Sequence, residues 1–127
     1  MAPAALVLIV DDAPDNREAY AEYLRFRGFR TLEAGTGAEA IALARSQQPD
    51  VILLDMRLPD IDGLEVSRLV RADPALHQSK IIAVSAAVFP ADVAAALDSG
   101  CHVFLQKPCL PDALVVEIER LLEQAVM

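Results

Sequence analysis

Residues 51–54 are four consecutive apolar residues that run directly into Asp55. Pro49 precedes this run and Pro59 follows it, so the segment has the length of a strand rather than of a helix. A strand without polar alternation is buried on both faces, as in a parallel sheet covered by helices. The run therefore predicts such a sheet. It also puts Asp55 at the carboxyl edge, where open α/β sheets bind their ligands.

A second apolar segment, residues 6–10, ends in Asp11 and Asp12. If the two strands are neighbours in a parallel sheet, three carboxylates converge at one edge. Carboxylates that close raise one another's pKa unless a cation lies among them. Oxygen ligands without thiolate or imidazole suit Mg²⁺ better than a transition metal. The pattern favours a magnesium site, although Asp55 taken alone fits equally well a residue that caps the following loop.

The whole chain alternates strand and helix patterns five times, which predicts a doubly wound α/β fold with a parallel sheet. Thr36 and Glu39 have capping-box spacing, and Gly28 and Gly100 mark helix ends. The predicted strands are residues 6–10, 30–33, 51–55, 81–85 and 103–105. The predicted helices are residues 14–27, 37–46, 63–72, 90–99 and 111–125.

Helical spacing of apolar residues predicts which face of each helix packs on the sheet. Phe26 lies beside the stripe of the first helix, so we expect it to be partly exposed. The residues expected to face the sheet are Ala19, Tyr20, Tyr23 and Leu24 in the first helix, Ile41 and Leu43 in the second, Leu64, Val66, Leu69 and Val70 in the third, and Leu114, Ile118, Leu121 and Leu122 in the last.

Length and composition narrow the class of protein. The 127 residues suit a single domain spanning residues 1–127 with a real core, since 54% of them are hydrophobic. The net charge of −8 opposes direct binding to nucleic acid. No apolar run approaches the roughly 18 residues that cross a bilayer. Cys101 and Cys109 lack metal-site spacing and fit a reducing compartment, so we expect a cytoplasmic protein without a membrane segment.

The residues that follow the predicted strands form an ordered set: Asp11-Asp12, Asp55, Ser85 and Lys107-Pro108. With this order and spacing, and with Asp62-Gly63 completing a D-x-x-x-P-x-x-D-G pattern, the chain resembles a response-regulator receiver domain over residues 6–122. Among receivers it is similar to free-standing single-domain members. The resemblance implies five strands in the flavodoxin-like order 2-1-3-4-5, covered by five helices.

The resemblance implies that Asp55 accepts a phosphoryl group from the phosphohistidine of a histidine kinase or histidine phosphotransfer protein. It further implies that Mg²⁺ is held by Asp12, Asp55 and the backbone carbonyl of Arg57, with Asp11 holding a metal-bound water. Lys107 is a compact cation suited to bridging Asp55 or a phosphoryl oxygen. Outside this context, Lys107 would be a solvated lysine before a turn.

Ser85 and Phe104 form the switch that the resemblance implies. The Ser85 hydroxyl would move toward the phosphoryl group, and the aromatic ring of Phe104 would turn inward behind it. Tyrosine is commoner at this aromatic position in the family. A lone serine at a strand end is more often a helix cap, and core packing explains Phe104 equally well. The resemblance also implies a cis peptide bond between Lys107 and Pro108.

The predicted function is a stand-alone receiver that signals to a downstream protein target by protein contact. The alternative is a receiver module excised from a longer regulator or hybrid histidine kinase. A small phosphatase with an aspartyl-phosphate intermediate is disfavoured, because Arg57 stands where such enzymes place an aspartate as general acid. We therefore expect no enzyme activity beyond phosphotransfer to itself and autodephosphorylation. The Arg57 side chain is expected to shield the acyl phosphate, since Ala87 opposite it is too small to do so.

Overall fold

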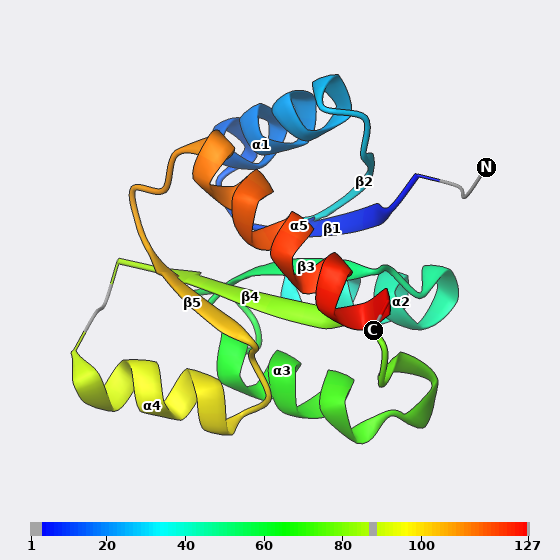
Figure 1. Cartoon of the computed structure of the whole chain (residues 1–127). Coiled ribbons are helices and arrows are strands. Elements are labelled where there is room, and N and C mark those ends of the chain that lie inside the picture. Colours follow the sequence, from blue (N-terminus) through cyan, green and yellow to red (C-terminus); the bar gives the residue numbers. More distant parts are fainter. Residues whose placement is uncertain (1–3, 87–88, 127) are drawn as a thin grey trace.

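The computed structural model of the protein describes residues 4–86 and 89–126, and for residues 124–126 the backbone alone. Five parallel strands form one sheet in the order β2-β1-β3-β4-β5 (Figure 1). This order confirms the predicted fold. The strands are β1 (Leu6–Val10), β2 (Arg30–Ala34), β3 (Val51–Asp55), β4 (Lys80–Ser85) and β5 (Val103–Gln106).

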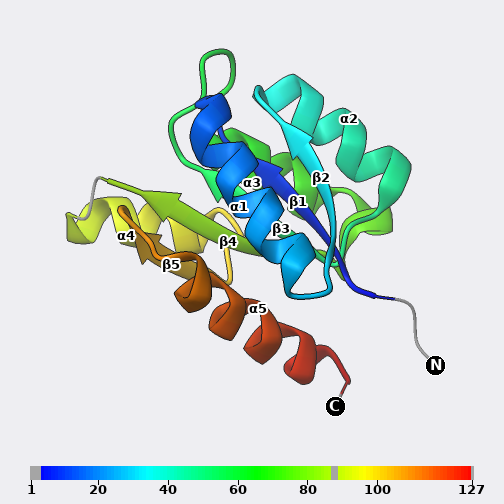
Figure 2. The same ribbon diagram turned by 90° about the horizontal axis from the view of Figure 1, so that it is seen from above.

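Helices cover both faces of the sheet, with α1 and α5 on one face and α2, α3 and α4 on the other (Figures 1 and 2). A short 3-10 turn after α3 was not predicted, and the Asp73 carboxylate caps it by accepting from the Ala75 amide at 3.0 Å. The helices are α1 (Pro14–Phe26), α2 (Gly37–Gln47), α3 (Gly63–Ala72), η1 (Pro74–Leu76), α4 (Pro90–Asp98) and α5 (Pro111–Val126).

Alternate side chains of the buried strands pack into two separate hydrophobic cores, one on each face of the sheet. In β3, Val51 and Leu53 pack toward α1 and α5, whereas Ile52 and Leu54 pack toward α2 and α3. The same alternation holds in β1 and β4, and all five residues of β3 are buried. The continuous apolar runs in the sequence are therefore explained, because each strand needs apolar side chains on both faces.

The predicted face of α1 is wrong at one position. Ala21 and Leu24 are the buried residues of this helix, Tyr20 and Tyr23 flank them, and Ala19 is exposed. A stripe centred between Ala21 and Leu24 follows the helical repeat and excludes Ala19. In the second and third helices the buried aliphatic residues are Ala40, Ala44, Val66 and Val70. Ile41, Leu43 and Leu64 are partly buried and pack against the edge of the core, and Leu69 is also partly buried.

No helix among the described residues is long and apolar enough to span a lipid bilayer.

Candidate functional site

Three aspartates meet at the carboxyl edge of the sheet. Asp11 and Asp12 follow β1, Asp55 ends β3, and these two strands are paired neighbours. Carboxylate oxygens from the three residues lie within 4.8 Å of one another. Asp11 and Asp55 are 3% and 6% exposed, while Asp12 faces solvent. The site therefore has two buried carboxylates and one that remains open to a ligand.

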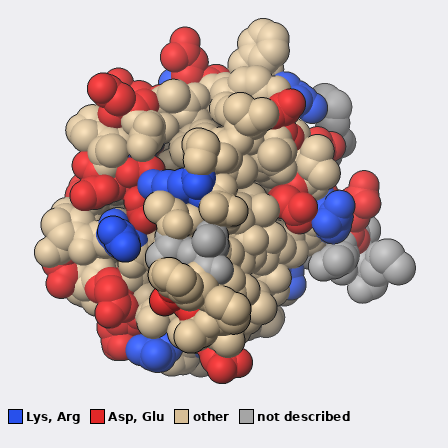
Figure 3. All heavy atoms as spheres, turned by 90° about the vertical axis from the view of Figure 1, so that its left-hand side faces the viewer, with Lys and Arg blue, Asp and Glu red and all other residues tan. Residues whose placement is uncertain are grey.

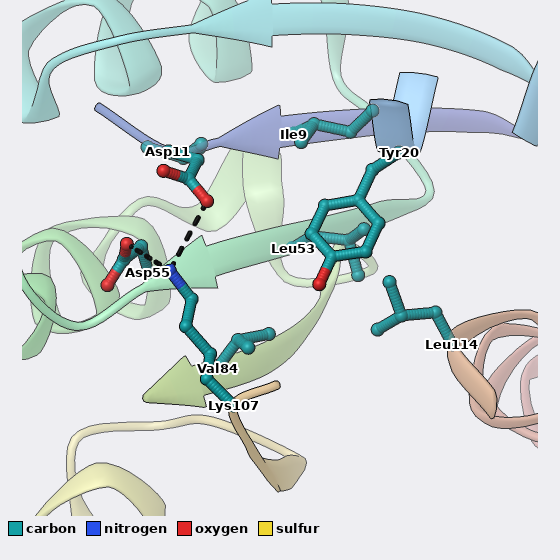
Figure 4. Close-up of a pocket in the computed structure, with 9 residues that line it drawn as sticks. Ile9, Asp11, Tyr20, Leu53, Asp55, Val84, Lys107 and Leu114 are labelled. Atoms are coloured by element: carbon teal, nitrogen blue, oxygen red, sulfur yellow. Dashed lines mark hydrogen bonds and ion pairs between the residues drawn. The ribbon is translucent and has the colours of Figure 1, made fainter. Parts of the chain in front are cut away.

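Lys107 supplies the cation that such a cluster needs. Its Nζ atom donates to Asp55 Oδ2 at 2.8 Å and to Asp11 Oδ2 at 3.3 Å (Figure 4). Burial by itself would lower the pKa of Lys107. The hydrogen bonds and charges of Asp55 and Asp11 outweigh that effect and raise the pKa. Lys107 is therefore a fixed positive charge between two buried carboxylates, and its peptide bond to Pro108 is cis, as the resemblance implied.

Backbone amides orient the free oxygens of the two buried carboxylates. Asp11 Oδ1 accepts from the Ala13 amide at 2.9 Å, and Asp55 Oδ1 accepts from the Arg57 amide at 2.9 Å. Arg17 in α1 supports the first of these loops, because its Nη1 atom donates to the backbone carbonyl of Asp11 at 2.8 Å. The carboxylates are thus held from several directions before any ligand binds.

Tyr20 lies beside the charged cluster, which the sequence did not reveal. Its ring lines a small pocket together with Asp11, Asp55 and Lys107 (Figure 4). Its hydroxyl donates to the backbone carbonyl of Cys109 at 2.9 Å and so ties α1 to the loop after β5. Burial raises the pKa of Tyr20, which keeps the phenol protonated. Helical spacing could predict that Tyr20 is partly buried but not what it faces.

Ser85, Phe104 and Arg57 lie together in a neighbouring groove rather than in the carboxylate cluster. Met56, Asp62, Leu64 of α3, and Asp92 and Ala95 of α4 complete this groove. Ser85 is buried at the end of β4, and Phe104 packs against the core on the α4 side of the sheet. The side chain of Arg57 is exposed and lines this groove. Ala87, the expected neighbour across the site, is outside the described residues.

On the other side of the site, a shallow groove lies between α1 and the loop after β5. Lys107, Tyr20 and Cys109 line it, together with Ala19. A second groove begins at Ala19 and continues along α1 to Phe26. Figure 3 shows the face toward which the strands end, where basic side chains lie among acidic ones and a broad uncharged area lies near the centre.

Comparison with known proteins assigns the family. A family model described as response regulator receiver domain matches residues 7–119. The chain belongs to this family. The polar-differentiation response regulator DivK of Brucella ovis is 34% identical over 102 residues, which cover 80% of this chain and 83% of that protein.

Solved receiver structures agree with the fold. The chemotaxis protein CheY4 of Vibrio cholerae is 28% identical, with a TM-score of 0.88 over 93% of this chain and 98% of that chain. A CheY-like receiver domain protein of Methanospirillum hungatei has a TM-score of 0.90 over 96% of both chains at 24% identity. The second likeness concerns the fold alone.

Proposed function

We propose that this receiver accepts a phosphoryl group on Asp55 and signals its phosphorylation through contact with other proteins. The observation that carries the proposal is the pairing of Lys107 with a buried Asp55 inside a cluster of three carboxylates. Buried ion pairs of this kind are expensive to build, because each charge loses its hydration. Because these buried ion pairs lie at the ligand-binding edge of the sheet, they indicate a reactive site rather than interactions that stabilise the fold.

The carboxylate cluster fits a magnesium ion. Asp11, Asp12 and Asp55 offer oxygen atoms alone, and these atoms are close enough together to share one small cation. Asp12 and Asp55 would hold the ion directly, the backbone carbonyl of Arg57 would add a third oxygen, and Asp11 would act through water. Bound Mg²⁺ supplies positive charge that offsets the charge of the carboxylates and of the phosphoryl group.

In the transfer, a carboxylate oxygen of Asp55 attacks the phosphorus of a phosphohistidine. The new bond is an acyl phosphate, and the bond that breaks joins phosphorus to the donor's imidazole nitrogen. Lys107 moves its hydrogen bond from the Asp55 carboxylate to a phosphoryl oxygen and keeps its charge throughout. Ser85 then moves toward the phosphoryl group and donates a hydrogen bond to it from its hydroxyl. The ring of Phe104, in the same groove, turns inward behind Ser85 and so changes the surface on the α4 side.

The donor we propose is a histidine kinase or a histidine phosphotransfer protein, and the output is contact with a downstream protein target. The protein would not act as an enzyme on separate substrates, because Arg57 replaces the general acid that an aspartyl-phosphate phosphatase requires. Direct binding to nucleic acid is not part of the proposal, given the net charge of −8.

Replacing Asp55 tests the proposal. With Mg²⁺ and acetyl phosphate, the protein should gain one phosphoryl group, which intact-protein mass spectrometry detects. Asp55→Asn should gain none, because an amide is a poor nucleophile. Asp50→Asn is a matched control: Asp50 sits just before β3 and accepts from the Leu6 amide, far along the strand from the site. Undiminished labelling of Asp55→Asn would refute Asp55 as the acceptor.

A further inference from the structure

The segment between β3 and α3 is fixed at its tip as well as at its base. At the base, the Gly63 amide donates to Met56 O at 3.1 Å, and α3 approaches so closely that a Cβ atom on Gly63 would lie 2.6 Å from Met56 Cα. At the tip, the Asp60 carboxylate accepts from the amides of Gly37 at 2.7 Å and Ala38 at 2.9 Å. These two hydrogen bonds join the tip to the first turn of α2.

The N-terminal cap of α2 is therefore shared between a local and a distant residue. Thr36 accepts from the Glu39 amide at 3.1 Å, while Asp60 accepts from the two amides before it. A carboxylate suits this place, because amides and helix dipole both present positive charge there. The hydrogen bonds from Ala38 and Gly37, with a further one from Ile61, lower the pKa of Asp60, so it is ionised at neutral pH.

The same segment carries the backbone group proposed to face the metal. Asp55 Oδ1 accepts from the Arg57 amide, and the two residues Leu58 and Pro59 are all that separates Arg57 from Asp60. Proline restricts one of these residues and leaves the connection little freedom. The peptide units around Arg57 consequently lie between two fixed points. On one side the Arg57 amide donates to the Asp55 carboxylate, and on the other the Asp60 carboxylate accepts from the first amides of α2.

The loop after β1, which carries Asp11 and Asp12, is also held by the residues at the junction of β2 and α2. The Asp11 amide donates to Ala34 O at 3.1 Å. Arg17 donates to Asp11 O at 2.8 Å and to Glu33 Oε1 at 3.2 Å. Residues 33–38, at the junction of β2 and α2, thus anchor both loops that bear the candidate metal ligands.

We propose that Asp60 is a positioning residue that, by capping α2 from the neighbouring loop, fixes the Arg57 carbonyl for Mg²⁺ binding. The inference rests on the proposed function, because it concerns the metal held by Asp12 and Asp55. Without Asp60 the segment gains conformational freedom, which binding of the metal must then remove. Outer contacts that orient metal ligands commonly change affinity by about tenfold or more.

The test compares two variants that remove different parts of one helix cap. Asp60→Ala frees both α2 and the loop, whereas Thr36→Ala weakens α2 and leaves the loop attached. Mg²⁺ titration calorimetry should give an affinity about tenfold or more weaker for Asp60→Ala and nearly unchanged for Thr36→Ala. Amide hydrogen exchange without Mg²⁺ should be faster at Arg57 in Asp60→Ala alone. Equal effects of the two variants would overturn the inference, since loss of helix stability would then explain both.

Two further measurements distinguish the positioning role of Asp60 from a simple effect of its charge, and from a failure of the proposed metal site itself. Asp60→Asn loses the same charge as Asp60→Ala but retains a carbonyl acceptor, so it should recover part of the Mg²⁺ affinity and of the Arg57 protection. Identical affinities of these two variants, with unchanged Arg57 exchange, would assign the effect to charge and overturn the inference. If Mg²⁺ binding requires Asp12 but is unchanged in Asp60→Ala, the inference about Asp60 is overturned while the proposed metal site stands. Failure of the unaltered protein to bind Mg²⁺ would overturn the proposed site as well.

Discussion

At the scale of single residues, the site depends on contacts that hold its charged side chains in place. Lys107 offsets part of the charge of two buried carboxylates, and backbone amides hold the oxygen atoms that it does not reach. The side chain of Arg57 differs from these groups, because it is exposed and lines the groove beside Ser85. Its charge is therefore free to act on what enters the site rather than to hold the site together.

Arg57→Ala should tighten Mg²⁺ binding and shorten the lifetime of the acyl phosphate. The exposed cation competes with the metal for the carboxylates, and after phosphorylation it shields the phosphorus from water. An exposed charge contact contributes at most about 1 kcal/mol, so each change should be about fivefold or less. Calorimetry and the decay of phosphorylated protein in one buffer measure both changes. A longer lifetime in the variant would mean that Arg57 assists hydrolysis instead.

At the scale of elements, alternation and capping signals could predict the five strands and most helix ends, whereas the strand order followed from the resemblance to receiver domains. β1 and β3 have the predicted bounds, whereas β2, β4 and β5 are each one residue longer than predicted, because backbone pairing continues beyond the predicted ends, as at Gln106 of β5. Asp11, Asp12, Asp55 and Lys107 could be placed together because the ends of parallel strands share an edge. The contacts of Asp60 and Tyr20 could not, because their partners are far away in the sequence and no local pattern encodes them.

His102 gives the short strand β5 a dependence on pH. Its backbone amide donates to Ile81 O at 2.8 Å, and its Nδ1 atom accepts from the Ile81 amide at 3.0 Å. Partial burial of its ring lowers the pKa of His102 from its ordinary value of 6.5, and the charges of Arg71 and Lys80 lower it further. The folded protein thus favours the neutral ring. The resulting stabilisation is complete above pH 6.5 and is lost as the pH falls through the lowered pKa.

The free energy of unfolding should therefore decrease as the pH falls below 6.5, as urea denaturation at several pH values would measure. His102→Asn retains an acceptor but does not titrate, so its stability should depend less on pH in this range. His77→Asn is the control, because His77 is an exposed histidine whose Nδ1 atom contacts Pro74 O in η1 rather than a strand of the sheet. An unchanged pH dependence in His102→Asn would contradict the assignment.

At the scale of the whole molecule, the two grooves that meet at Ala19 connect the site with the far end of α1. Phe26 marks that end and is 84% exposed, with Tyr23 beside it. A protein donor that reaches Asp55 past Lys107 would cover this side of α1, whereas a small phosphodonor would not. Exposed aromatic residues are common anchors of such interfaces.

Phe26→Ala should slow phosphotransfer from a cognate phosphorylated donor protein by about tenfold and leave labelling by acetyl phosphate unchanged. The reason is that the substitution removes contact area without touching the carboxylate cluster. Leu97→Ala on α4 is a matched control, since Leu97 is also an exposed apolar residue but lies on the opposite face of the sheet. Equal rates for Phe26→Ala and the unaltered protein with the donor would exclude this surface from docking.

The position of Tyr20 has an optical consequence. The chain contains no tryptophan and two tyrosines, so its intrinsic near-ultraviolet emission comes largely from Tyr20 and Tyr23. Tyr20 lies against the charged cluster, while Tyr23 lies along α1 beside Phe26. Phenol emission is sensitive to nearby charge, which makes one of the two emitters a built-in, label-free reporter of events at Asp55.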